Sequence, residues 1–388
     1  MTDFLTGLGR REIELLNTIR KNGPVTKNGL IEKTGARLTT LNRSMKLLEN
    51  QKLIAETGTS VSTGGRKPIE YDVTGDSAFA IGVDISRTYT RVIAVNLKMH
   101  ILKESRFDMD ETITPRECAD RIASILKQMT STLSSDQAKV LGVGIGTVGP
   151  MDRNSGVLLH PQGFRNPEWN NEVLLKDLLQ KKTGLPCEID NGANTAVLAE
   201  FLSGSGRGYH CVAYIHCGVG IRTAVIQNGT ILRAMNDNDD AFAHMTIDQN
   251  GPPCLCGGKG CLENYVSLAS INARYAAITG NSVNDKELFR RAAGLEKEAA
   301  DAFQKSAGTL GIGISNLAKL MNPDLIILSG PLIANYAPYY SICVDTFTEW
   351  NNRNSPVIFQ KEGFFKENAV AIGAGLMVIE RSFNQTRR

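Results

Sequence analysis

The stretch from His244 to Glu263 is HMTIDQNGPPCLCGGKGCLE, with one histidine and three cysteines in the pattern H-x9-C-x-C-x4-C-x-E. Three thiolates and one imidazole complete a tetrahedral shell around zinc and leave no open position for water, which is typical of structural zinc. The glycine-rich run 257–260 allows a turn tight enough to return the last cysteine to the first two. The pattern predicts a structural zinc site with four ligands, His244, Cys254, Cys256 and Cys261. The alternative is that these are ordinary reduced thiols beside a turn.

Length and composition are typical of a globular protein of two to three domains. The chain has 388 residues, of which 42% are hydrophobic and 21% are charged, so it can bury sizeable cores. No apolar run approaches the ~20 residues that cross a bilayer, and residues 1–11 lack the apolar core of a signal peptide. The cysteines outside the cluster show no pairing pattern, so we expect a reducing, cytoplasmic compartment and no membrane insertion.

The net charge of +3 is unevenly distributed along the chain. Residues 1–72 hold 12 Lys and Arg against 8 Asp and Glu, a balance of +4. The remaining residues hold 31 against 32, a balance of −1. A small basic segment on a nearly neutral body suggests that this segment meets a polyanion, although solvated helices also reach such a charge.

Three short helices are expected in the basic segment. Ile13, Leu16 and Ile19 share one helical face from Arg10 onward, and the run Asn22-Gly23-Pro24 ends this helix. A second helix is expected over 27–33 with Thr26 as its cap, and a third from about 38 to 51 after a glycine turn. Strands at 53–56 and 68–73 flank a flexible hairpin with a basic tip. This pattern predicts a winged helix-turn-helix domain over residues 1–75.

The third helix is the element that we expect in the major groove of DNA. Amide and guanidinium groups pair with adenine and guanine edges, whereas hydroxyl and ammonium groups suit phosphates. Cations at the wing tip suit a narrow, A·T-rich minor groove. We therefore predict DNA contacts from Thr39, Thr40, Asn42, Arg43 and Lys46 on the helix and from Arg66 and Lys67 on the wing. The alternative is that these side chains form only the solvated face of a small helical domain.

Apolar strands and amphipathic helices alternate from residue 76 onward. The stretch from Ala78 to Val95 holds two apolar runs around Asp84. Further along, we expect strands near 100–107, 140–148, 211–226 and 325–328, and helices over 115–132 and near 373–381. Such alternation is typical of α/β architecture in which helices cover the sheets. Two such halves with a ligand cleft between them fit the length of a second domain, residues 76–388.

Four features of this second domain together resemble the ROK family of repressors, open reading frames and kinases. They are the hairpin around Asp84, the glycine-rich strand end at 142–150, the glycine-rich turn 217–221, and the Cys3His cluster that ends in Glu263. The resemblance implies the actin-like ATPase and sugar-kinase fold of two lobes. It covers essentially the whole chain, because ROK repressors also carry an N-terminal winged helix-turn-helix.

The motifs of ROK kinases also show which kinase positions are altered in this chain. ROK kinases open with Asp-x-Gly-Gly-Thr, and this chain has Asp84-Ile85-Ser86-Arg87-Thr88, so backbone amides cannot approach a triphosphate closely. The family's Glu-Asn-Asp-Ala-Asn corresponds to residues 190–194, where Gly192 replaces the catalytic aspartate and can be no general base. The family's Glu-x-Gly-His, whose glutamate grips sugar hydroxyls, corresponds to Ala241-Phe242-Ala243-His244. The resemblance therefore implies a regulator without catalytic residues and without kinase activity.

Three of the family's usual sugar contacts remain: Asn191, His244 and Glu263. They imply a sensor of a polar ligand, either a sugar or a sugar phosphate. For Asn191 and Glu263 the alternative is that they only hydrogen-bond other protein groups. The second ring nitrogen of His244 is expected to face the ligand, which would couple the metal to the pocket.

We therefore expect a DNA-binding transcriptional regulator of carbohydrate metabolism, and more specifically a repressor. A homodimer or higher even oligomer would place its winged helices on a pseudo-palindromic operator in double-stranded DNA. Effector binding in the cleft would change lobe closure and hence the separation of these DNA-binding domains. Two alternatives stay open, an active ROK sugar kinase with an accessory DNA-binding domain and a repressor controlled by a protein partner.

Overall fold

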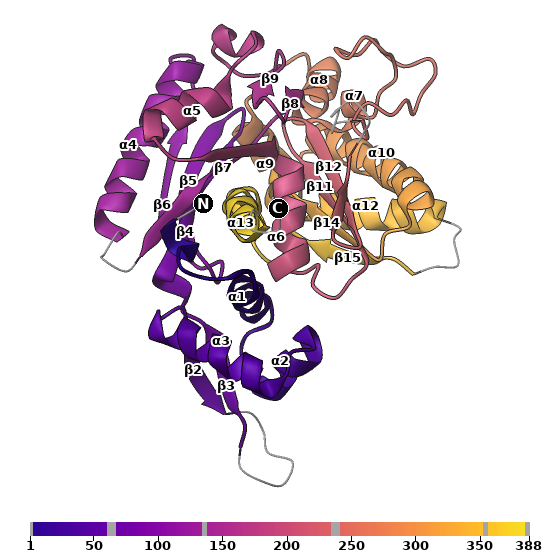
Figure 1. The fold of residues 1–388 in the computed structure, drawn as a ribbon. Coiled ribbons are helices and arrows are strands. Elements are labelled where there is room, and N and C mark those ends of the chain that lie inside the picture. Colours follow the sequence, from indigo (N-terminus) through magenta and orange to yellow (C-terminus); the bar gives the residue numbers. More distant parts are fainter. Residues whose placement is uncertain (1–2, 60–66, 134–137, 234–240, 352–355, 385–388) are drawn as a thin grey trace.

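The computed structural model describes residues 3–59, 67–133, 138–233, 241–351 and 356–384. Figure 1 shows a small N-terminal head, residues 10–73, next to two lobes that are each built on one five-stranded sheet. The expected α/β architecture of two lobes with a small helical head is confirmed.

The head contains α1 (Arg10–Asn22), β1 (Val25–Thr26), α2 (Lys27–Thr34), α3 (Leu38–Asn50), β2 (Ile54–Thr59) and β3 (Ile69–Val73), and η1 (Asp3–Leu5) precedes it. The side chain of Thr26 starts α2 by accepting a hydrogen bond from the amide of Gly29 at 3.2 Å. Gly35 ends α2 in the left-handed region, at φ +66°. The three predicted helices and the two strands after them are confirmed, with ends that differ by at most three residues.

The first lobe has the sheet order β10-β7-β4-β5-β6. Its strands are β4 (Ala78–Ile85), β5 (Tyr89–Asn96), β6 (Ile101–Asp108), β7 (Lys139–Thr147) and β10 (Cys187–Asn191), and η2 (Gly75–Ser77) leads into them. α4 (Pro115–Leu133) and α5 (Leu175–Thr183) cover one face of this sheet. Between β7 and α5 lie β8 (Met151–Asp152), β9 (Val157–Leu158) and η3 (Pro167–Asn170). β4 is buried along its whole length because helices cover both faces, as is typical of central strands in α/β sheets.

The second lobe repeats the plan of the first, with the order β13-β12-β11-β14-β15. Its strands are β11 (Cys211–Cys217), β12 (Ile221–Gln227), β13 (Thr230–Leu232), β14 (Leu325–Ser329) and β15 (Ile358–Lys361). The outer helices are α7 (Glu263–Val266), α8 (Leu268–Thr279), α9 (Asp285–Ala293), α10 (Lys297–Met321), α11 (Pro331–Asn335) and α12 (Ala337–Trp350). In both lobes three antiparallel strands are followed by two parallel ones, so the lobes share one topology.

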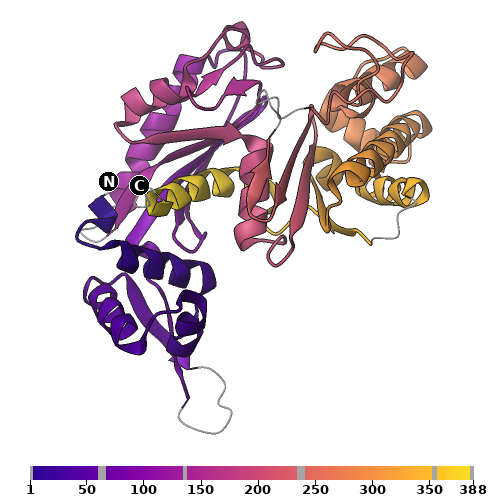
Figure 2. The ribbon, with the colours of Figure 1, turned by 45° about the vertical axis from the view of Figure 1, so that its right-hand side comes forward.

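Two helices, α6 (Gly192–Ser203) and α13 (Ala369–Asn384), lie between the sheets and pack against each other (Figures 1 and 2). A Cβ atom at Gly373 of α13 would lie only 1.7 Å from the carbonyl oxygen of Thr195 in α6. α13 also lies directly on β4, where a Cβ at Gly82 would lie 1.9 Å from the carbonyl oxygen of Ala371. α13, which follows η4 (Lys366–Asn368), starts four residues before the predicted final helix and ends three residues after it.

The head and the first lobe share one hydrophobic core, which joins α1 and α3 to α13. The rings of Phe4 and Phe383 pack edge to face with their centroids 6.3 Å apart. Arg20 and Lys21 of α1 both pair with Glu380 of α13, the latter at 2.7 Å. Burial raises the pKa of Glu380, but the two cations outweigh burial and hold that pKa below its ordinary value. The head therefore rests on α13.

We expect Glu380→Gln to loosen the packing of the head on α13. Arg20 is only 4% exposed at its side chain, and although Asn17 Oδ1 stays as an acceptor, loss of the charge on its second partner costs about 1–3 kcal/mol. Hydrogen exchange of the α1 amides should therefore become about 5- to 150-fold faster. Glu117→Gln is the matched control, because the Arg121–Glu117 pair is exposed and such pairs contribute little.

The pairing of Arg20 with Glu380 also predicts how the stability of the head on α13 changes with pH. A carboxylate with a lowered pKa stabilises the fold above its unfolded pKa, and this contribution is lost as the pH falls through the folded value. The difference between wild type and Glu380→Gln should thus be full at neutral pH and shrink in acid. Equal exchange rates of α1 in both proteins at neutral pH would show that Glu380 does not hold the head.

Candidate functional site

The predicted zinc ligands come together in a compact loop before α7. Short antiparallel bridges join Thr246 to Cys261 and Pro253 to Lys259. The amide of Cys254 donates to the carbonyl of Gly258 at 2.8 Å, which closes the turn between the ligands. The glycine-rich run thus returns the last cysteine to the first two, as its composition predicted.

The four donor atoms lie close together, and two of their separations match those of a tetrahedral zinc shell. The ligand atoms of His244, Cys254, Cys256 and Cys261 all lie within 4.8 Å of one another. Cys254 Sγ lies 3.6 Å from His244 Nδ1, and Cys256 Sγ lies 3.6 Å from Cys261 Sγ. Tetrahedral zinc with ordinary bond lengths requires separations of about 3.5–3.8 Å. The residues therefore fit a closed zinc shell.

His244 connects this cluster to a cavity between the lobes. Its Nδ1 faces the cysteines, whereas its Nε2 lies 4.0 Å from Glu263 Oε2. His244 and Glu263 both line a cavity of about 400 Å³, which we call the larger cavity. Gly149, Pro150 and Gln162 of the first lobe and Ile221 of the second line it as well. The imidazole thus has one nitrogen toward Cys254 and the other toward Glu263, and its contact with a ligand stays a prediction.

Asn191 is placed differently from the other two predicted ligand contacts. It is buried at the end of β10, and its side-chain oxygen accepts a hydrogen bond from the amide of Ala193 at 2.9 Å. This bond caps α6, so the oxygen is engaged in the helix. Asn191 is not among the residues that line the larger cavity. Its contact with a ligand stays a prediction.

An arginine lies beside Gly192, the position where the sequence predicts that a catalytic base is missing. Gly192 is the first residue of α6, and a Cβ atom there would lie 2.8 Å from Arg222 Nη1. The neighbouring carboxylate, Asp190, is paired with Arg233 and accepts a hydrogen bond from Asn194 at 2.9 Å. Asp190 is therefore held by other partners. Sequence reasoning missed Arg222, although an arginine in an otherwise apolar strand after a glycine-rich turn was a usable signal.

The hairpin between β4 and β5 uses its own amides internally. The hydroxyl of Ser86 accepts hydrogen bonds from the amides of Thr88, at 3.3 Å, and Tyr89, at 3.1 Å. Arg87 Nε donates to the carbonyl of Gln162 at 2.8 Å, across the mouth of the larger cavity. Ser86 thus satisfies amides that a phosphate-binding hairpin would present to a nucleotide.

Asp84, at the end of β4, is almost completely buried. The hydroxyl of Tyr89 donates to its Oδ2 at 2.9 Å. Burial raises the pKa of Asp84, and the opposing effects of Arg222 and Tyr89 do not cancel that rise. Its Oδ1 has no hydrogen-bond partner among the described residues.

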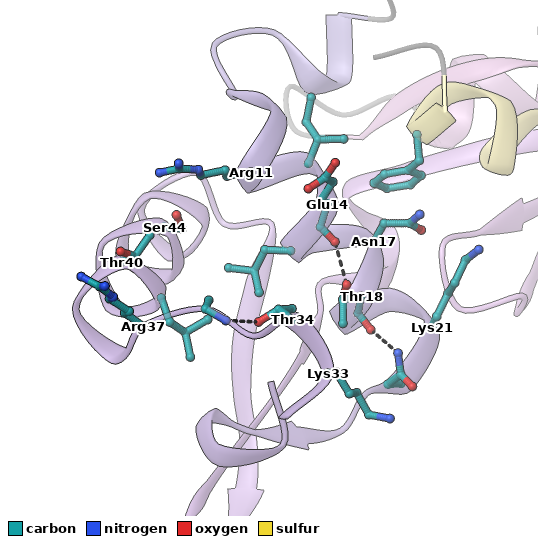
Figure 3. Close-up of a pocket in the computed structure, with 16 residues that line it drawn as sticks. Arg11, Glu14, Asn17, Thr18, Lys21, Lys33, Thr34, Arg37, Thr40 and Ser44 are labelled. Atoms are coloured by element: carbon teal, nitrogen blue, oxygen red, sulfur yellow. Dashed lines mark hydrogen bonds between the residues drawn. The ribbon is translucent and has the colours of Figure 1, made fainter. Parts of the chain in front are cut away.

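Most of the predicted DNA contacts share one exposed face of α3. Thr39, Asn42, Arg43 and Lys46 are exposed, and Lys27 of α2 donates to Asn42 Oδ1 at 2.9 Å. Thr40 is half-buried and points into a different space, a groove of about 780 Å³ between α1 and α3 (Figure 3). Lys67 is exposed beside the wing, and Arg66 lies outside the described residues.

The groove in Figure 3 separates α1 from the start of α3. Four cations lie along it, Arg11 and Lys21 from α1, Lys33 from α2, and Arg37 just before α3. Phe383 of α13 closes one end. The basic charge of the head is therefore not confined to the exposed face of α3.

Two lobes of one topology, the cavity between them and the adjoining Cys3His cluster define a protein of the sugar-kinase fold. The chain belongs to the ROK family, whose model matches residues 80–381. It is 28% identical over 326 residues to the xylose repressor of Bacillus spizizenii, covering 83% of this chain and 82% of that protein.

Relatives of both kinds, repressors and kinases, are found. A glucokinase of Halalkalibacterium halodurans is 29% identical over 269 residues, covering 64% of this chain and 79% of the kinase. The fold matches the crystal structure of a ROK family transcriptional regulator, a homolog of the E. coli MLC protein, with a TM-score of 0.76 and 20% identity. That match covers 97% of this chain and 96% of the regulator, so it includes the head. Within the described ranges, no helix is long and apolar enough to span a membrane.

Proposed function

We propose that this protein is a sugar-responsive transcriptional repressor whose head binds DNA and whose cleft binds the effector. The observation that carries the proposal is Gly192 with Arg222 beside it, in a chain that also bears a winged head. A sugar kinase needs a general base at the reacting hydroxyl, and a guanidinium cannot serve as one. The similar repressor is named for xylose, which makes sugars the class of effector to test.

The route from cleft to head runs along α13. Near its start, Val370 lies 3.4 Å from the position that a Cβ of Gly192 would take. Near its end, Glu380 and Phe383 contact α1 of the head. Sixteen residues of helix span about 24 Å as one stiff element. A change in lobe closure that moves α13 against α6 therefore moves the head, and such coupling typically amounts to ~1–3 kcal/mol.

DNA binding by the head is proposed for a homodimer on a two-fold operator. The exposed face of α3 presents the amide of Asn42 and the guanidinium of Arg43 for base edges. Half-sites on one side of the duplex are about 34–36 Å apart, so the two heads of a dimer must match that spacing. The four cations of the groove in Figure 3 are additional candidates for phosphate contacts.

We expect Arg43→Ala to weaken binding to a DNA site selected from a random pool by about 5- to 150-fold at fixed salt. The reason is that one bidentate base contact is worth about 1–3 kcal/mol. Fluorescence anisotropy of the full chain with labelled duplex measures the change. Arg121→Ala, which removes an exposed arginine of α4 far from the head, is the control and should bind like wild type. Failure to select any DNA site would contradict the repressor proposal itself.

The Cys3His cluster is proposed to hold one structural zinc ion. His244, Cys254, Cys256 and Cys261 would supply all four ligands and leave no coordination site for substrate. The metal would hold the loop that precedes Glu263 and would fix the orientation of the His244 ring toward the cavity.

We expect about one zinc per chain in the purified protein, and Cys256→Ser should lose it because one of four ligands is gone. Elemental analysis measures the metal, and exchange of the 244–263 amides should accelerate in the variant. Cys211→Ser is the matched control, because this buried thiol lies outside the cluster and a hydroxyl retains its bond to the carbonyl of Met321. Wild-type protein that contains no zinc after purification without chelators would refute the assignment.

We expect neither wild type nor Gly192→Asp to phosphorylate sugars. A general base typically contributes ~10²–10⁴-fold, and a carboxylate restored at 192 would meet Arg222 and form an ion pair instead of accepting a proton. The hairpin is independently altered, since Ser86 already occupies its amides. A coupled ADP assay with hexoses, pentoses and amino sugars tests this, with a ROK glucokinase as the positive control. Sugar-dependent turnover by wild type would favour the kinase alternative, which the glucokinase relative keeps open.

A further inference from the structure

Two arginines, one from each lobe, line two neighbouring cavities of the cleft. Arg87 comes from the β4–β5 turn of the first lobe, and Arg222 comes from β12 of the second. Both line the larger cavity together with His244 and Glu263. Both also line a smaller cavity of about 70 Å³ together with His216. The larger cavity is therefore lined by a carboxylate, an imidazole and two guanidinium groups.

One nitrogen of Arg222, Nη1, is buried without a hydrogen-bond partner among the described residues. The residue is only 8% exposed, and within the part of the chain that the structure describes its Nη1 finds neither solvent nor an acceptor. Gly192 leaves room for this nitrogen, because any Cβ at 192 would lie 2.8 Å from it. A buried guanidinium nitrogen is unfavourable unless an acceptor arrives. The side chain is therefore prepared for an anionic acceptor that the described residues do not supply.

The charged and titratable neighbours of Arg222 do not provide a hydrogen-bond acceptor for its Nη1. Asp84 faces Arg222, but its unpartnered Oδ1 and Nη1 of Arg222 do not hydrogen-bond each other. Burial lowers the pKa of His216 well below its ordinary value, and the charges of Arg222 and Arg87 lower it further. His216 is therefore neutral at pH 7 and adds no charge. Glu263 Oε1 accepts from the amide of Ile221 at 3.3 Å, and it is a neighbour of Arg87, because a Cβ at Gly220 would lie 2.5 Å from Glu263 Oε1 and 2.6 Å from Arg87 Nη1.

We propose that Arg222 and Arg87 form a binding site for the phosphate of a phosphorylated monosaccharide, whose hydroxyls face Glu263 and His244. This inference deepens the proposed sensor function and rests on it. A phosphate monoester carries about −1.5 to −2 charges at pH 7 and offers three acceptor oxygens, enough for both guanidinium groups. A carboxylate offers one charge and two oxygens, so it matches the pair less well. The larger cavity, at about 400 Å³, is within the usual range of small-molecule sites.

The same arrangement explains how an effector would act on the lobes. Arg87 belongs to the first lobe and Arg222 to the second, so one phosphate bound by both would join the two lobes. A neutral sugar on Glu263 and His244 contacts mainly the second lobe. The phosphate therefore supplies the differential contact that a closed cleft needs over an open one.

The binding test uses the full chain and no DNA. Calorimetry at constant ionic strength compares inorganic phosphate with three matched pairs, glucose, fructose and N-acetylglucosamine, each against its 6-phosphate. We expect inorganic phosphate to bind and at least one phosphate ester to bind about 10-fold or more tightly than its neutral sugar. Arg222→Met should weaken the phosphate ligands about 10- to 150-fold, because hydrogen bonds to charged groups are the strong ones. Arg222→Lys should retain part of the affinity, and Arg121→Met should match wild type.

Thermal unfolding with and without phosphate separates a binding role from a structural one. Arg222→Met removes the unpartnered Nη1 but also a charge that faces Asp84, so its unfolding temperature without ligand serves as its own baseline. Added phosphate should raise the unfolding temperature of wild type and not that of Arg222→Met. An equal rise in both proteins would show that Arg222 does not bind the phosphate, and this result would overturn the proposal.

Failure of the site and failure of the repressor function give different results. Phosphate binding that depends on Arg222, in a chain that selects no DNA site, would support the site and refute the function. Release of a selected DNA site by a neutral sugar, equal in wild type and Arg222→Met, would overturn the site and leave the function intact. Equal affinity for neutral and phosphorylated sugars, or no response to any phosphate, would likewise overturn the site.

Discussion

The close backbone packing of α6 against α13 is the constraint on which the rest of this structure depends. Gly373 allows α13 to touch the carbonyl of Thr195, and Gly82 allows the same helix to lie directly on β4. A side chain at either glycine would separate the lobes, because the carbonyl oxygen opposite lies within 2 Å of the Cβ position. The cleft, its cavities and the support for the head all depend on this contact. At its far end α13 carries Glu380, which holds the head.

The cleft has the architecture of a sugar kinase, and its residues support the proposal that its chemistry differs. Gly192 offers no carboxylate, Ser86 accepts from hairpin amides, and Asp190 is paired with Arg233. A positive charge lies beside Gly192, since a Cβ there would be 2.8 Å from Arg222 Nη1. Under the proposed function, the site does not deprotonate a hydroxyl and can stabilise an anion instead. Binding energy that a kinase uses in its transition state would then be available for holding the lobes together.

Local patterns predicted local structure well. The predicted zinc ligands lie within eighteen residues of one another, so spacing and glycine content were sufficient to anticipate that the structure brings these four side chains together. The helices of the head were equally predictable. Thr26 begins α2 and Gly35 ends it, and each does so through contacts within one turn of the helix. The duplication of lobe topology was not visible, since the two sheets share strand order without sharing a residue pattern. Thr40 was assigned to the exposed face of α3, whereas packing against α1 places it in a groove.

The sequence by itself determined the family and the order of elements, and it predicted the residues of the Cys3His cluster and the lack of a carboxylate at Gly192. Each of these depends on residue identity or on spacing along the chain, which the sequence contains in full. Only the tertiary structure decided that Arg222 fills the space beside Gly192, that Asn191 caps a helix, and that α13 touches both cleft and head. These are contacts between segments far apart in the chain. Their geometry follows from how two sheets and two helices pack, which no local pattern specifies.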